Sequence, residues 1–113
     1  MDAKKRSNPA LRFLPQRIRN MVERAARERT AMAANAARFH LRKHQREVRV
    51  IRAKVDSRID RLRAIYYEQG LPVQRGSWPP EDLREELDMV HKLEAGIEAA
   101  WNELRHAYPE VRS

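Results

Sequence analysis

The chain contains no cysteine, which excludes a disulfide framework and a zinc-finger site. It has only two Phe, two Trp and three Tyr, whereas charged residues make up 35% of its 113 residues. So few bulky side chains would not fill a compact globule, but they are typical of an elongated helical protein. No apolar run approaches the roughly 20 residues that span a bilayer, so a membrane protein is not expected. No hydrophobic region follows the basic start, so we expect a protein that is not secreted, in a compartment that the sequence leaves open.

Motifs of catalysis are also missing. The chain has no Gly-rich phosphate loop and no nucleophile elbow, and an extended helical protein offers no deep pocket. We therefore expect no enzyme, no catalytic residue, no cofactor and no small-molecule substrate. His40 and His44 have the four-residue spacing of a metal pair on one helix face, but no further ligand pattern supports a metal site. We interpret them as polar surface residues.

The charge is strongly asymmetric. Residues 1–54 contain sixteen Lys or Arg and four Asp or Glu, a balance of +12, whereas residues 55–113 contain eight and twelve, a balance of −4. Such asymmetry indicates that the first half meets a polyanion or an acidic surface.

The longest segment without Pro or Gly runs from residue 16 to residue 69, and strong helix formers dominate it. As one helix it would be roughly 80 Å long. Gly70 suits the left-handed position just past a helix, and Pro72 prevents continuation. The polar run over residues 42–47 leaves open whether the helix bends there.

A second helix is predicted over residues 81–108, after a connection over residues 70–80. It is about half as long, so a return helix reaches back only to about residue 41. The sequence thus predicts an all-α fold, an extended antiparallel helical hairpin that resembles a coiled coil. Its one very long basic helix projects beyond its partner, with residues 16–41 projecting and residues 42–69 in the hairpin.

The two ends complete the domain plan. Residues 1–15 form a basic N-terminal arm that we expect to be flexible at its start. Within it, Pro9 to Leu14 forms a short helical turn whose Leu11, Phe13 and Leu14 make a small apolar hook. Residues 109–113 form a tail.

Apolar residues at helical spacing predict the hairpin core. This set is Val48, Ile51, Val55, Ile59, Leu62, Tyr66, Leu83, Leu87, Val90, Ile97, Trp101 and Leu104. Pairing the two stripes gives position sums near 149, with Trp101 beside Val48. Glu94 then lies within reach of Arg52 or Arg58 and sets the register as an ion pair.

A second apolar stripe lies on a face of the long helix rotated by roughly 110° from the first. Its members are Ile18, Met21, Val22, Ala25, Met32, Ala36 and Phe39. Because the return helix does not reach them, we expect this stripe to dock a partner outside the chain. Residues 16–40 would then be largely unfolded until they bind.

Basic residues of the first half predict a surface that follows a phosphate backbone. The candidate nucleic-acid-binding residues are Lys4, Lys5, Arg6, Arg17, Arg24, Arg27, Arg38, Arg42, Arg46, Arg49 and Arg52. Those from Arg24 to Arg52 lie within about 120° on a helical wheel. No helix-turn-helix, zinc-finger, RNP or KH pattern accompanies them, so we expect backbone recognition of RNA or DNA without sequence preference.

The predicted function is that of a non-enzymatic structural component of a larger assembly, such as a ribonucleoprotein or a virion. Its hairpin docks on other protein subunits and its basic helix contacts nucleic acid. One alternative is a protein-only adaptor or inhibitor that inserts its Ala- and Arg-rich helix into an acidic groove. Another is an antiparallel homodimer in which two projecting halves cover each other.

Overall fold

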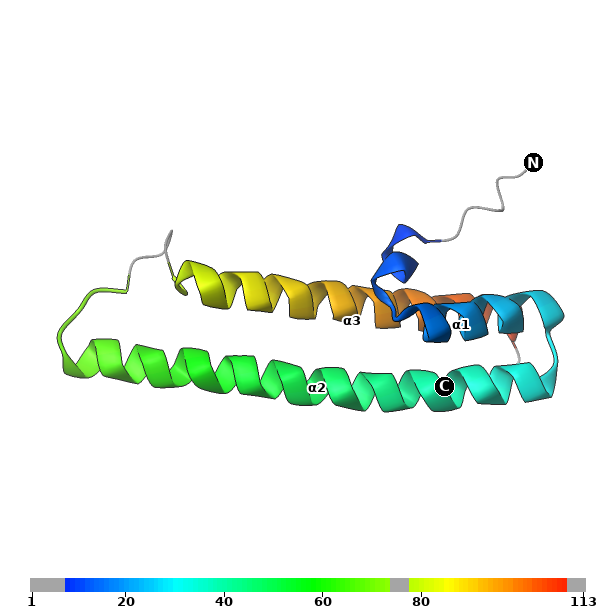
Figure 1. The fold of residues 1–113 in the computed structure, drawn as a ribbon, viewed down its shortest axis with the longest axis horizontal. Helices are drawn as coiled ribbons and strands as arrows, with labels where there is room; N and C mark the ends of the chain where they lie inside the picture. Colours follow the sequence, from blue (N-terminus) through cyan, green and yellow to red (C-terminus); the bar gives the residue numbers. More distant parts are fainter. Residues whose placement is uncertain (1–7, 74–77, 110–113) are drawn as a thin grey trace.

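The computed structural model describes residues 8–73 and 78–109. A short 3₁₀ helix, η2 (Pro9–Phe13), precedes three α-helices, namely α1 (Gln16–Glu28), α2 (Ala31–Glu68) and α3 (Glu81–Ala107). The long α2 and the shorter α3 pack antiparallel as a hairpin, and the molecule measures 58 × 29 × 23 Å (Figure 1). The expected all-helical hairpin is therefore confirmed.

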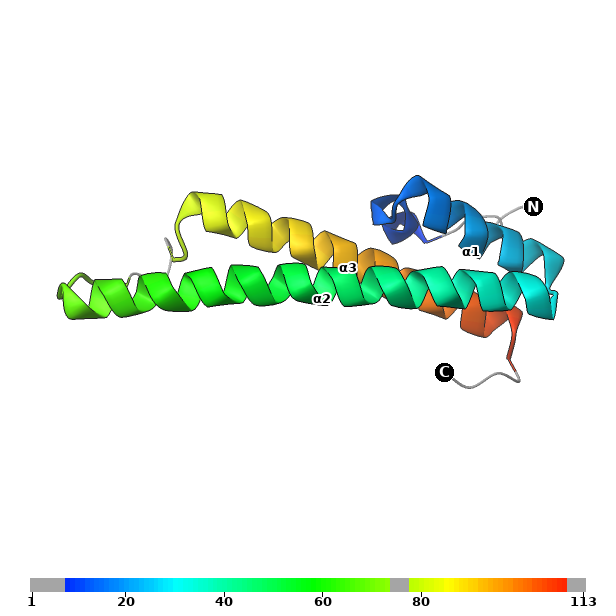
Figure 2. The same cartoon turned by 60° about the horizontal axis from the view of Figure 1, so that its bottom comes forward.

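The predicted single helix over residues 16–69 is wrong at one point, because the chain reverses at Arg29 and Thr30. Arg29 adopts the left-handed conformation, with φ of 56°, and its N–H donates to the carbonyl oxygen of Ala25. Thr30 then caps α2, its hydroxyl accepting from the N–H of Ala33 at 3.1 Å. Consequently α1 does not extend α2 but folds back along it, over the half of α2 nearest its N-terminus (Figures 1 and 2).

Burial of the apolar face of α1 explains the reversal. Val22 and Ala25 are fully buried, and Ile18 and Met21 pack against the same core. This burial offsets the strain of a non-glycine residue in the left-handed region, about 1–3 kcal/mol. The expectation that residues 16–41 project and need an outside partner is thus wrong for α1, because α2 and α3 cover its apolar face.

The predicted second stripe is accordingly divided. Ile18, Met21, Val22 and Ala25 face the interior of a three-helix bundle. In contrast, Met32 is 82% exposed, Phe39 is 62% exposed and Ala36 is also exposed. Only the α2 part of the stripe therefore remains as an outward surface.

The predicted start of the short helical turn and the predicted end of the long helix are both close to the observed ones. Asn8 caps η2, its side chain accepting from the N–H of Ala10, and Leu11 and Leu14 are buried as the expected hook. The long helix ends at Glu68, and Gly70 follows with φ of 68°. The first residues of the predicted arm, part of the connection and most of the predicted tail lie outside the described residues.

The register of the hairpin differs from the predicted one by about a turn. Arg52 pairs with Glu94, Arg58 with Glu86 and Gln45 with Trp101, so position sums are 144–146 rather than 149. The Arg52–Glu94 pair, with N···O distances of 2.8 and 2.9 Å, confirms the predicted ion pair. Apolar stripes that repeat every three or four residues face each other in either register, which is why the pattern alone did not separate them.

Of the residues predicted for the hairpin core, all but one are buried or half-buried. Buried members are Val48, Val55, Leu83, Val90, Ile97 and Leu104, and half-buried members are Ile59, Leu62, Tyr66, Leu87 and Trp101. Ile51, however, is 44% exposed. Ile51 lies on the same side of α2 as His44, seven residues further along. The start of α1 lies beside His44, so α1 does not extend far enough to cover Ile51. Beyond that point α3 alone packs on α2.

Tyr108, directly after α3, connects the two ends of the chain. Its ring is buried, and its hydroxyl lies 2.8 Å from the carbonyl oxygen of Ala25 and 3.0 Å from that of Thr30. These two oxygens flank the reversal between α1 and α2. The C-terminal end of α3 therefore holds the turn that was not predicted.

Candidate functional site

Basic side chains gather on the side of α2 that faces away from α1. Arg42, Gln45, Arg46 and Arg49 of α2, together with Trp101 and Arg105 of α3, line one hollow of about 400 Å³. We name Arg42, Arg46, Arg49 and Arg105 the arginine cluster. On the opposite side of α2, His40, Lys43, His44 and Glu47 contact the start of α1 instead.

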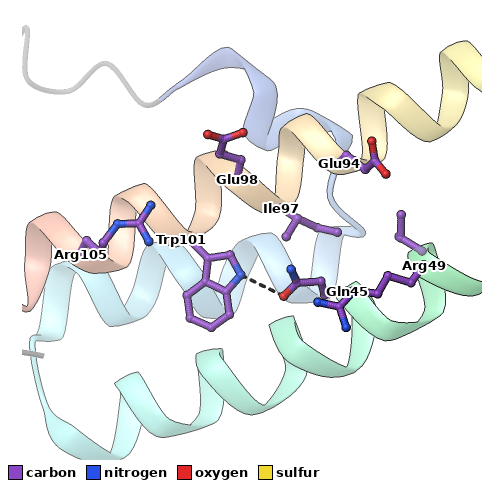
Figure 3. Close-up of a pocket in the computed structure, with 8 residues that line it drawn as sticks. Gln45, Arg49, Glu94, Ile97, Glu98, Trp101 and Arg105 are labelled. Atoms are coloured by element: carbon purple, nitrogen blue, oxygen red, sulfur yellow. Dashed lines mark hydrogen bonds between the residues drawn. The ribbon is translucent and has the colours of Figure 1, made fainter. Parts of the chain in front are cut away.

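Trp101 occupies the centre of the arginine cluster. Its indole N–H donates to the side-chain oxygen of Gln45 at 3.2 Å, and the guanidinium of Arg42 lies 5.7 Å from a ring centroid. In Figure 3, Arg105 lies on one side of the indole and Gln45 on the other, with the Arg49 side chain extending toward Gln45, whereas the carboxylate of Glu98 points away from the indole. The site thus combines one aromatic ring with several exposed cations.

The cations of this cluster are available for a ligand. No carboxylate of the described residues forms an ion pair with Arg42, Arg46 or Arg49, and Arg105 only donates to the side chain of Asn102. All four arginines are exposed. Guanidinium groups that are exposed and not engaged by a carboxylate suit bidentate contacts to phosphate oxygens.

Arg52 is different, because it belongs to the hairpin seam. Its hydrogen bonds to Glu94 raise the pKa of Arg52, and Asp56 lies 3.5 Å from it. The neighbouring pair is similar, since the hydrogen bond from Arg58 lowers the pKa of Glu86. Arg52 therefore sets the register and has less capacity for a phosphate.

The predicted continuous strip from Arg24 to Arg52 is wrong in its geometry, because its first residues lie on α1. Arg24 pairs with Glu28 at 2.8 Å, and Arg27 is exposed on the same helix. Arg17 lines a hollow with His40 and His44. Arg38 remains on α2 and donates to Asn35, while Lys4, Lys5 and Arg6 lie outside the described residues.

Trp101, Gln45 and Arg105 were not predicted as site residues. Trp101 was assigned to the hairpin core alone, although even the predicted register placed it beside Val48, next to Arg49. A helical wheel that included both helices would have placed the indole at the edge of the basic face.

His44 is buried, not a surface residue as predicted. It is 8% exposed, and its Nε2 atom has no hydrogen-bond partner. Burial lowers the pKa of His44 below the usual 6.5, and Glu47, with an oxygen 3.8 Å from Nδ1, opposes this with a smaller effect. Arg17 and Lys43 line the same hollow as His44. In the described part of the chain, no three His, Asp or Glu side chains gather as a metal site.

We expect this burial to make folding sensitive to acid. Because the pKa of His44 is lower in the folded state, the unfolded chain binds more protons as the pH falls below about 6.5, and the free energy of unfolding decreases. Urea unfolding between about pH 7 and about pH 5.5 measures this slope. His44→Gln should reduce it. An unaltered slope in His44→Gln would contradict the interpretation.

None of the described helices combines the length and apolar character that crossing a membrane requires. No family model, curated protein or solved structure matches the chain, so its function is inferred from the geometry of the site itself.

Proposed function

We propose that this protein is a non-enzymatic component of a larger assembly that binds the nucleic-acid backbone through the arginine cluster. The observation that carries the proposal is the arrangement of Arg42, Arg46, Arg49 and Arg105 around Trp101. No described carboxylate neutralises the three cations on α2. Because the side chains project from two packed helices, the backbone positions that carry the cations are fixed before a ligand arrives.

The spacing of these cations suits a chain of phosphates. Arg42, Arg46 and Arg49 extend over roughly 10 Å of the α2 axis at 1.5 Å per residue. One nucleic-acid strand presents a phosphate about every 3.4 Å along a duplex axis. The contacts are to charge rather than to base edges, which accounts for binding without sequence preference.

The salt dependence of binding tests this function. If each of the four arginines neutralises one phosphate, log K should fall linearly with log salt, with a slope of about −3.6 for duplex DNA and about −2.8 for single strands. Fluorescence anisotropy of labelled RNA and DNA of mixed sequence measures K between roughly 50 and 200 mM salt. Scrambled sequences should bind equally well. Negligible affinity for every pool at the lowest salt would refute the proposal.

The outward α2 surface supports docking on protein. Met32 and Phe39 are exposed, and Met21, Met32, Ala33 and Ala36 take part in lining a hollow of about 220 Å³. Large exposed apolar side chains next to a hollow are typical of protein contacts. We assign the other subunits of the assembly to this surface.

A protein-only adaptor is the second candidate, and the same exposed surface favours it. In its predicted form it needs a free Ala-rich helix, but Ala25, Ala34 and Ala37 are buried within the chain. An adaptor would therefore use Met32 and Phe39 rather than the alanines. Met32→Glu combined with Phe39→Glu would then abolish its function, whereas nucleic-acid binding through the arginine cluster would persist.

A further inference from the structure

The indole of Trp101 gives the arginine cluster a feature that phosphate binding alone does not use. We propose that this pocket takes one unpaired base of a single-stranded nucleic acid, stacked on Trp101, while the flanking phosphates contact the arginine cluster. This inference rests on the proposed function and names its ligand as single-stranded.

The size of the site matches one flat group. The hollow beside the arginines, about 400 Å³, adjoins another of about 370 Å³. Gln45, Arg49, Trp101 and Arg105 line both. These volumes lie at the lower end of the range for small-molecule sites, about 300–1,000 Å³, so a nucleotide unit fits and a double helix does not enter.

The chemistry of the walls is that of a base-stacking platform. Ile97 and Val48 are the apolar residues that line the second hollow with the indole. Glu94, which is paired with Arg52, and Glu98 line it as well. The guanidinium carbon of Arg42 lies 5.7 Å from a ring centroid of Trp101, within the range of a cation–π contact, so this side chain must move aside for a base to stack on that face. Stacking of a base on such a ring is tolerant of sequence because every base has a π-face.

The side-chain amide of Gln45 adds a polar contact that, like stacking, does not depend on the identity of the base. Its oxygen accepts from the indole N–H, which fixes the side chain between α2 and α3. The NH₂ group then points its donors away from that bond, and every base offers acceptor atoms at its edge. The site therefore holds a base without selecting one.

A duplex must first extrude a base before that base can enter this pocket, whereas a single strand need not. Bases within a duplex are stacked and paired, and extruding one requires a few kcal/mol. Trp101 is half-buried between α2 and α3, whereas the arginines of the cluster are exposed. We therefore expect a duplex backbone to reach the arginines without its paired bases reaching the ring. Single strands should consequently bind more tightly than duplexes of equal charge.

Tryptophan fluorescence tests the proposal directly. Trp78 lies against Tyr66, far along the hairpin from Trp101, so Trp78→Phe leaves Trp101 as the reporter and serves as the matched control variant. The probes are a DNA oligomer of roughly 12 nucleotides, an abasic oligomer of the same length and a duplex of mixed sequence. We expect the single strand alone to quench Trp101, and to bind roughly tenfold more tightly than the abasic oligomer.

Substitution of the ring separates this inference from the proposed function. Trp101→Leu should weaken single-strand binding roughly tenfold to a hundredfold, and should weaken duplex and abasic binding by clearly less than that. Trp101→Phe, which keeps an aromatic ring in the fold, should give an intermediate loss. Circular dichroism verifies that both variants fold. Equal binding of single strands and abasic oligomers, without quenching, would overturn the stacking proposal while leaving backbone binding intact. Loss of all binding in the parent protein would refute both.

Discussion

Replacing Arg42, Arg46 and Arg49 together by glutamate should lower affinity for nucleic acid by roughly a hundredfold or more at moderate salt. Three exposed cations that contact phosphates become three anions that repel them. The fold should persist, because no described carboxylate depends on these side chains and all three are exposed. The salt slope measured by anisotropy should also become shallower by nearly three units.

The matched control is the triple variant Arg17→Glu, Arg24→Glu and Arg27→Glu on α1. It changes the net charge equally, and a single straight helix would give both triple variants the same effect. Because α1 folds back on the other side of α2, we expect the control to lose affinity only a few-fold, through long-range charge. Equal losses in the two variants would show that net charge, not the arginine cluster, controls binding.

The second large effect is expected at Gly96 of α3, where η2 crosses most closely. A Cβ atom at this position would lie 3.1 Å from the carbonyl oxygen of Ala10, 3.3 Å from Cβ of Phe13 and 3.4 Å from the backbone nitrogen of Leu14. Gly96→Leu adds a whole side chain against that backbone, and overpacking of this kind costs typically 1–3 kcal/mol. We expect η2 and α1 to detach while α2 and α3 remain paired.

Limited trypsin digestion and circular dichroism measure this detachment. Cleavage next to Arg27 and Arg29 should become rapid, and helix content should fall by about the 13 residues of α1. Ala95→Leu is the matched control, since Ala95 is the exposed neighbour of Gly96 in the same helix. Unchanged protease protection in Gly96→Leu would contradict the assigned contact, as would loss of the helix signal from α2 and α3.

The sequence predicts those parts of the fold that local chemistry determines. The end of α2 follows from Gly70, the short turn at Pro9 follows from Asn8 and proline, and the ion pair of Glu94 follows from its place in an apolar stripe. Each of these depends on a few residues close in sequence or on one periodic pattern.

The reversal at Arg29 and Thr30 depends instead on distant residues. No Gly or Pro marks it, and the only local signal is Thr30, a favourable helix cap that also occurs within helices. The reversal is stabilised by burial of Val22 and Ala25 and by the hydroxyl of Tyr108, which comes 78 residues after Thr30. Propensity alone favours an unbroken helix here, and tertiary packing overrides it.

The same limit applies to the candidate site. Arginines at helical spacing predict a basic face, and part of that face is found on α2. The contribution of Trp101 depends on which turn of α3 lies beside Gln45, and a register shift of one turn preserves the apolar pattern. The single-helix hypothesis also moved Arg24 and Arg27 to the wrong surface.

The contact of Tyr108 with the α1–α2 reversal has a consequence for synthesis. A ribosome makes η2 and α1 before the residues that hold them, since Gly96, which lies against η2, and Tyr108, which contacts the end of α1, come much later in the chain. Until α3 has been made, the apolar face of α1 lacks part of its packing surface, so in the nascent chain this face is exposed or shielded by a chaperone. α1 thus reaches its final position only after the end of α3 has been made.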